Sequence, residues 1–179
     1  FLDPKVFNKE SLIGVPGLFK CWKKGNVGII NALGTGVADD KAVYSYVNKM
    51  IVYYLGEQPK LNQVETFLCE NKVHRQHVIE NIDKLVVKPA NASGGYGIMI
   101  GPKAPKKERD EMVKKIKKKP RDFVAQPLEI LSTIPTICEN GIEPRHLDLR
   151  PCRLTGKTSY VTTGGLTRVA LRKGSTIVN

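Results

Sequence analysis

Residues 85–100 read Leu85-Val86-Val87-Lys88-Pro89-Ala90-Asn91-Ala92-Ser93-Gly94-Gly95-Tyr96-Gly97-Ile98-Met99-Ile100. A run rich in β-branched residues leads to Lys88 and to a loop with three glycines, and a second apolar run follows. Glycine allows positive φ and a close approach of the backbone to an anion, so several N–H groups can converge on phosphate oxygens. Lys88 adds a point charge beside them. The stretch therefore predicts a β-hairpin that binds phosphate, and ATP is the nucleotide to consider.

The same stretch also fits a plain tight turn between two strands, because a glycine cluster alone is a weak motif. It is not a Walker loop, since Lys88 precedes the glycines and no Gly-Lys-Ser/Thr follows. It is not a Rossmann fingerprint, because residues 98–102 predict a strand ended by a turn and not the start of a helix. The residues of the loop alone leave the tight turn and the phosphate loop both open.

Composition narrows the class of protein. The 179 residues suffice for one large domain or two small lobes, and no apolar run approaches the ~20 residues of a membrane span. The chain begins at Phe1 without a signal peptide or an initiator methionine, so we expect an excised piece of a longer protein. Four cysteines without a C-x-x-C pair predict free thiols in a reducing cytoplasm. His74 and His77 are expected to be solvated helix residues.

The net charge of +12 indicates an anionic partner. Much of it lies at residues 103–121, where Met112, Val113 and Ile116 predict an amphipathic helix with a basic outer face. Such a run of lysines is usually a solvated face. A basic nucleic-acid-binding module is the alternative, but no aromatic interleaving or recognised motif supports it, so nucleic acid is not expected as a partner.

Outward from the hairpin, the apolar pattern predicts further elements. We expect helical segments at residues 39–55, 66–81 and 106–118. We expect strands at residues 27–31, 123–127, 145–154, 158–163, 167–171 and 176–178, with turns at 155–157, 164–165 and 173–174.

Residues 27–55 are expected to hold a strand, a glycine turn and a helix that starts with two acidic residues. Asp39 and Asp40 suit the positive end of the helix dipole, so capping is their plain role. The N-terminus of that helix could also bind an anionic group, and it is therefore a second candidate anion site.

Four blocks of sequence carry a resemblance. They read Asn31-Ala32-Leu33-Gly34-Thr35-Gly36-Val37, Val87-Lys88-Pro89-Ala90, Leu147-Asp148-Leu149-Arg150-Pro151 and Gly164-Gly165-Leu166-Thr167-Arg168-Val169-Ala170-Leu171. With the order of elements, they resemble the circularly permuted type-2 ATP-grasp family. The resemblance implies an α+β fold in which two α/β lobes with antiparallel sheets grip a nucleotide between them. It implies an N-terminal α/β segment at residues 1–83 and the nucleotide-binding region at residues 84–179.

The same resemblance implies an ATP-dependent carboxylate–amine (or thiol) ligase, similar in outline to glutathionylspermidine synthetases. Such enzymes transfer the γ-phosphoryl group of ATP to a substrate carboxylate, and an amine attacks the acylphosphate. The implied cofactors are ATP and Mg²⁺, and the implied partners are a carboxylate substrate and an amine acceptor. A non-catalytic ATP-grasp scaffold stays open as an alternative.

Roles for single residues also follow from the resemblance. Lys88 would contact the ATP phosphates, and Gln126 would meet the adenine edge through its main chain. Asp148 would bind Mg²⁺, and its alternative role is a salt bridge on the face it shares with Arg150. The remaining implied site residues are the loop that covers the phosphates (Ser93, Gly94, Gly95, Gly97), the cations that neutralise the transferring phosphoryl group (Arg150, Arg168) and a further oxygen ligand of Mg²⁺ (Asn179).

Two features depart from the family pattern. The family commonly has a glutamate two residues before the metal-binding asparagine, and Ile177 stands there in this sequence. The family also continues beyond that asparagine, whereas this sequence ends at Asn179. We therefore expect either that the second carboxylate comes from elsewhere in the chain or, as the preferred explanation, that the sequence ends within the site.

Overall fold

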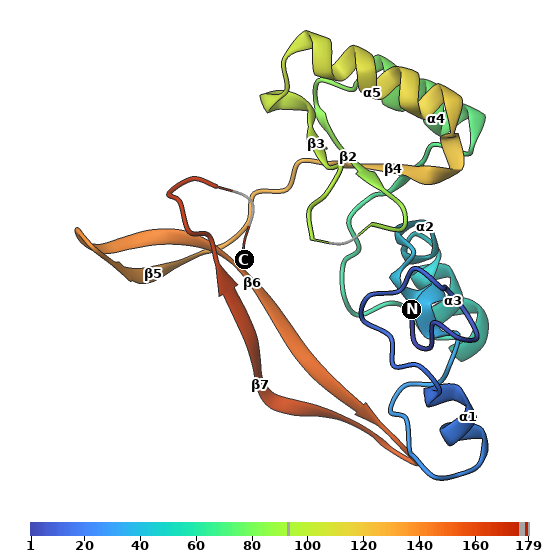
Figure 1. The fold of residues 1–179 in the computed structure, drawn as a ribbon. Coiled ribbons are helices and arrows are strands. Elements are labelled where there is room, and N and C mark those ends of the chain that lie inside the picture. Colours follow the sequence, from blue (N-terminus) through green and yellow to red (C-terminus); the bar gives the residue numbers. More distant parts are fainter. Residues whose placement is uncertain (93, 176–177, 179) are drawn as a thin grey trace. The chain divides into compact units, whose positions relative to one another are not determined.

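A computed structural model of the protein describes residues 1–92, 94–175 and 178 (Figure 1). Two units, Phe1–Tyr44 and Ser45–Asn179, make most of their contacts internally. The predicted division into an N-terminal α/β segment at residues 1–83 and a nucleotide-binding region at residues 84–179 stays a prediction. No helix among the described residues is long and apolar enough to cross a membrane.

The first unit is organised around a buried aspartate. The carboxylate of Asp3 accepts hydrogen bonds from the N–H groups of Lys5, Gly17 and Phe19 at 2.9 to 3.1 Å. Asp3 therefore caps the first turn of α1 (Leu18–Lys23) from a distant point in the sequence. Burial by itself would raise the pKa of Asp3, but these donors outweigh it and hold that pKa below its ordinary value.

The strand predicted at residues 27–31 is absent. Ile30 is 95% exposed and Asn31 has a positive φ of 70°, so the segment is an irregular loop. In the described part of the chain, no strand pairs with these residues. A strand needs a neighbouring strand to pair its backbone N–H and C=O groups. Residues 27–31 have no such neighbour within the described ranges, so the predicted strand does not form.

The single helix predicted at residues 39–55 is three shorter pieces, η1 (Thr35–Asp39), α2 (Lys41–Tyr44) and α3 (Val47–Leu55). Asp40 accepts a hydrogen bond from the N–H of Ala42 at 2.8 Å, so its predicted capping role is confirmed at α2. That cap starts a new helix and explains the first break. The second break, at residues 45–46, has no glycine or proline to mark it.

The hairpin predicted at residues 85–100 is confirmed as part of a four-stranded antiparallel sheet with the order β1-β4-β2-β3. The strands are β1 (Phe67–Leu68), β2 (Leu85–Pro89), β3 (Met99–Ile100) and β4 (Phe123–Pro127). The helices are α4 (Lys72–Glu80), η2 (Gly101–Lys103), α5 (Lys106–Lys118) and η3 (Pro120–Asp122). Residues 66–81 were predicted to be mainly helical, and their first part instead forms the edge strand β1.

The core lies between one face of this sheet and the two helices α4 and α5, which Figure 1 shows on the same side of it. Its buried members come from the sheet, from α4 and the turn after it, and from α5: Cys69, Val78, Ile82, Leu85, Val87, Met99, Met112, Ile116 and Ala125. Gly101 passes so close to the carbonyl oxygen of Ile82 that a Cβ would collide with it. The predicted basic outer face of α5 is confirmed, since Lys114, Lys115, Lys117 and Lys118 are exposed.

A second, three-stranded antiparallel sheet has the order β5-β6-β7, with β5 (Thr133–Cys138), β6 (Gly141–Thr155) and β7 (Ser159–Val169). The turn predicted at residues 155–157 is confirmed, and β5 was not predicted. The turn predicted at Gly164-Gly165 is wrong, because β7 continues through it. There the register shifts opposite Pro151 and Gly164 has a φ of 93°, so the glycines form a bulge within one strand. Two residues of the strand predicted at 176–178 lie outside the described residues.

Candidate functional site

The glycine loop between β2 and β3 has the backbone that the sequence predicts. Gly94, Gly95 and Gly97 have φ values of 67°, 77° and 72°, a region in which L side chains are strained. Ser93, the fourth predicted residue of this loop, lies outside the described residues. Lys88 stands in β2 just before the loop, and its side chain is partly buried.

A chain of hydrogen bonds extends from Lys88. Its Nζ donates to Oε1 of Gln126 at 2.6 Å, and Nε2 of Gln126 donates to Oγ1 of Thr66 at 2.8 Å. The hydroxyl of Thr66 in turn donates to the carbonyl oxygen of Val64 at 3.0 Å. The strand register explains why Lys88 and Gln126 are in contact. Val86 pairs with Gln126, and Lys88 lies two residues after Val86, so the side chains of Lys88 and Gln126 are on the same face of the sheet. Lys88 and Gln126 therefore lie on the sheet face opposite the helices.

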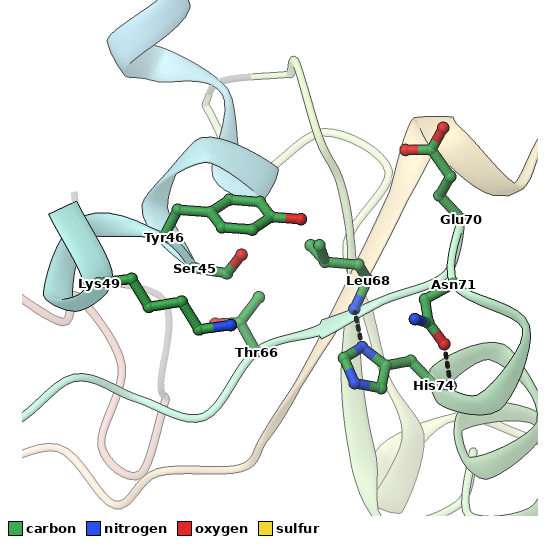
Figure 2. Close-up of a pocket in the computed structure, with 8 residues that line it drawn as sticks. All are labelled: Ser45, Tyr46, Lys49, Thr66, Leu68, Glu70, Asn71 and His74. Carbon is green, nitrogen blue, oxygen red and sulfur yellow. Dashed lines mark hydrogen bonds between the residues drawn. The ribbon is translucent and has the colours of Figure 1, made fainter. Parts of the chain in front are cut away.

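Thr66 also lines a pocket of about 500 Å³ (Figure 2). Its other lining residues come from the start of α3, from β1 and from the start of α4: Ser45, Tyr46, Lys49, Leu68, Glu70, Asn71 and His74. The Nδ1 atom of His74 accepts the N–H of Leu68 at 3.2 Å, so its Nε2 carries the proton in the neutral ring. The prediction that His74 is simply solvated is therefore wrong. An ammonium, a carboxylate and several hydroxyls surround this pocket, and it adjoins the hydrogen-bond chain of Lys88.

The second candidate anion site does not have its predicted basis. Residues 29–36 line a pocket of about 590 Å³ in the first unit. However, the strand before the glycine turn is absent, and the helix after it is a 3₁₀ helix of five residues. Because so short a helix has a small dipole, we assign no anion to its N-terminus.

Three predicted site residues meet across β6 and β7. Asp148 pairs with Arg168 in the register, and Nε of Arg168 donates to both carboxylate oxygens at 3.2 and 3.1 Å. Nη2 of Arg168 donates to Oδ2, and Nε of Arg150 lies 3.5 Å from the same oxygen. The hydrogen bonds from Arg168 hold the pKa of Asp148 below its ordinary value, and Asp148 raises the pKa of Arg168.

The carboxylate of Asp148 thus has the oxygen atoms that Mg²⁺ prefers, but two guanidinium groups contact it. Among the described residues, no group of three His, Cys, Asp or Glu side chains could hold a metal ion. Asn179, the second predicted ligand, and Ile177 lie outside the described residues. The described donor set fits Mg²⁺ in part: it offers one carboxylate, and the rest would have to come from nucleotide phosphates, water or other residues.

Sequence reasoning missed Thr66 and the role of the Gln126 side chain. Thr66 is 60 positions from Gln126 and Gln126 is 38 positions from Lys88, so no local pattern links them. The only available signal was a pair of polar residues at the ends of strands that otherwise bury apolar side chains. Local sequence motifs cannot identify such a contact without the strand register.

Comparison with known proteins identifies the family. The model of the family described as "Circularly permuted ATP-grasp type 2" matches residues 1–170, and the chain belongs to that family. The α+β fold class predicted from the sequence is confirmed with it.

Several relatives match the whole chain or most of it. An uncharacterized protein of Synechocystis sp. is 51% identical, and one of Mycobacterium tuberculosis is 48% identical, each over 100% of this chain. The chain spans 37% and 33% of their lengths. A Frankia casuarinae protein named "Putative glutamate--cysteine ligase 2-2" is 44% identical over 93% of this chain and 19% of its own length.

Proposed function

We propose that this chain is part of an ATP-dependent ligase that joins a carboxylate to an amine or thiol through an acylphosphate. The observation that carries the proposal is Lys88, held beside a loop of positive-φ glycines in a chain of the ATP-grasp family. The loop offers N–H groups and Lys88 offers a positive charge, and together they suit the phosphates of ATP.

In this proposal, Lys88 binds the nucleotide phosphates and the backbone of Ser93, Gly94, Gly95 and Gly97 covers them. The main chain of Gln126 meets the adenine edge. Arg150 and Arg168 neutralise charge on the transferring phosphoryl group, which requires Arg168 to exchange its contact with Asp148 for one with phosphate.

Asp148 and Asn179 are the residues that would hold Mg²⁺, which supplies charge neutralisation at the phosphate oxygens. The four cysteines are free thiols in the structure, which supports our proposal that the protein works in a reducing cytoplasm. The name of the Frankia relative agrees with a ligase, but because the match covers 19% of that relative, the name does not assign an activity to this chain.

A second candidate is a non-catalytic ATP-grasp scaffold. The observation in its favour is that both arginines already contact the single carboxylate expected to bind metal. This candidate and the ligase both predict nucleotide binding, and they differ in whether a carboxylate and an amine stimulate phosphate release.

Nucleotide binding is tested by the melting temperature of the full-length polypeptide that carries this chain. Mg-ATP at ten times its dissociation constant should stabilise it by about 1.4 kcal/mol, and Lys88→Ala should abolish the shift. Lys84→Ala is the matched control, because Lys84 is exposed just before β2. No shift at millimolar Mg-ATP in the unaltered protein would refute nucleotide binding.

The ligase reaction is tested by phosphate release with amino acids, short peptides and polyamines as substrates. Release should require a carboxylate and an amine together, because phosphoryl transfer needs a positioned nucleophile in line with the γ-phosphate. Asp148→Asn should lower turnover by orders of magnitude with a modest loss of ATP affinity. Hydrolysis that is indifferent to every acceptor would contradict the ligase, and binding without any release would favour the scaffold.

A further inference from the structure

We propose that the side chain of Gln126 positions Lys88 for the nucleotide phosphates, and that Thr66 sets the orientation of the Gln126 amide. This inference rests on the proposed function and adds two positioning residues to it. The carrying observation is the unbroken sequence of three hydrogen bonds from Lys88 through Gln126 and Thr66 to the carbonyl of Val64.

The network determines which way the amide of Gln126 points. The hydroxyl of Thr66 has one proton, which it donates to the carbonyl oxygen of Val64, so toward Gln126 this hydroxyl can only accept. Gln126 must therefore turn its NH₂ group to Thr66 and its Oε1 to Lys88. The other end demands the same orientation, because a lysine ammonium has only donors.

An amide suits this task better than a carboxylate. A lysine side chain that is not restrained has many rotamers, and part of this rotamer entropy is lost each time the side chain binds a phosphate. The 2.6 Å bond to Oε1 restricts Lys88 beforehand. Because Gln126 is neutral, its amide orders the ammonium without cancelling the positive charge.

Position within the fold supports the same role. Gln126 and Lys88 lie on diagonal positions of the paired strands β4 and β2, on the sheet face opposite the helix-covered core. The glycine loop begins a few residues after Lys88. The side chain of Gln126 thus acts on the lysine, while its main chain keeps the proposed contact with adenine.

The experiment measures the affinity of the full-length polypeptide for Mg-ATP, for inorganic tripolyphosphate and for adenosine. Gln126→Met removes the acceptor at similar volume and should weaken Mg-ATP and tripolyphosphate about tenfold, because a hydrogen bond to a charged group is lost. Adenosine, which has no phosphate, should keep its affinity within about twofold. Gln126→Glu should also weaken both anions, because a carboxylate would neutralise Lys88.

Thr66→Val should lower the affinity for Mg-ATP by a smaller factor, since it releases the amide of Gln126 without removing it. Thr66→Ser keeps the hydroxyl and should retain the affinity of the unaltered protein. Thr136→Val is the matched control, because the Thr136 hydroxyl makes the same type of bond to the carbonyl two residues before it, in β5. A double-mutant cycle completes the test: adding Gln126→Met to Lys88→Met should cost no further affinity if Gln126 acts through Lys88.

The outcomes separate the two proposals. If the unaltered protein binds neither Mg-ATP nor tripolyphosphate, the proposed function fails and this inference fails with it. If it binds both, the inference alone is overturned by equal losses for ATP and adenosine in Gln126→Met, or by additive losses in the cycle. Equal losses would show that Gln126 only supports the sheet.

Discussion

The two sheets of this protein differ in what covers them. No residue of strands β2 and β4 is exposed, and Val87 and Ala125 are fully buried beneath α4 and α5. Most side chains of β6 and β7 are exposed, with Leu149 at 64%. Both sheets are antiparallel and rich in β-branched or apolar residues. Strand pattern alone therefore does not tell a core sheet from an open one.

The candidate site residues are divided between the helix-covered sheet and the open sheet. The hydrogen bonds of Lys88 and Gln126 are partly buried on the covered sheet, where each bond is less exposed to competing water. The Asp148–Arg168 pair is also partly buried, with 27% and 30% of the two side chains exposed, but it lies on the open sheet, where the neighbouring side chains are mostly exposed. We therefore expect the first group to be sensitive to small changes of geometry and the second to be able to exchange partners.

Substitution of one apolar side chain in the core and one on the open sheet should give the largest difference in stability. In the chain of residues 1–179, Ile116→Ala should lower the free energy of unfolding by about 2–5 kcal/mol, because Ile116 is fully buried against the covered sheet. Leu149→Ala should change it by less than about 0.5 kcal/mol. Urea denaturation measures both. Equal losses would contradict the comparison, and a large loss for Leu149→Ala only in the full-length polypeptide would show that a further segment covers the open sheet.

Removal of the N-terminal cap of α4 should have a smaller effect on the free energy of unfolding. Asn71 caps this helix by accepting the N–H groups of Val73 and His74 at 2.9 and 3.1 Å. Asn71→Ala should lower the free energy of unfolding by about 1 kcal/mol, because two N–H groups lose their acceptor. Asn91→Ala, at an exposed loop position, is the control. An unchanged urea midpoint for Asn71→Ala would show that solvent replaces the cap.

The pH dependence of the open sheet should be the smallest and most local effect. The pKa of Asp148 is lowered by its hydrogen bonds to Arg168, so the pair stabilises β6 and β7 above the unfolded pKa of about 3.9 and loses this effect as pH falls through the folded value. Carboxyl NMR titration should show the Asp148 pKa rising toward its ordinary value in Arg168→Gln. Arg153→Gln, which alters an arginine bonded to Ser159, should leave it unchanged. A low pKa that survives Arg168→Gln would assign the shift to another group.

The predictions from local sequence succeeded where an element needs only its own residues. Helix α5 and strand β4 have the predicted bounds, because a 3.6-residue apolar period and a short apolar run followed by a proline can each be recognised within the segment itself. The positive φ of Gly94, Gly95 and Gly97 is equally local, since only glycine adopts it without strain. The family blocks added the expected site residues.

Tertiary structure decided what depends on partners far along the chain. The strand expected at residues 27–31 is absent because no strand pairs with it, and Gly164 lies in a bulge because β6 holds both halves of β7 in one sheet. The contact of Gln126 with Lys88 and the pairing of Asp148 with Arg168 both require a strand register that no single segment contains. Sequence by itself determined the glycine loop and the lysine that precedes it, and the register determined which side chain contacts that lysine.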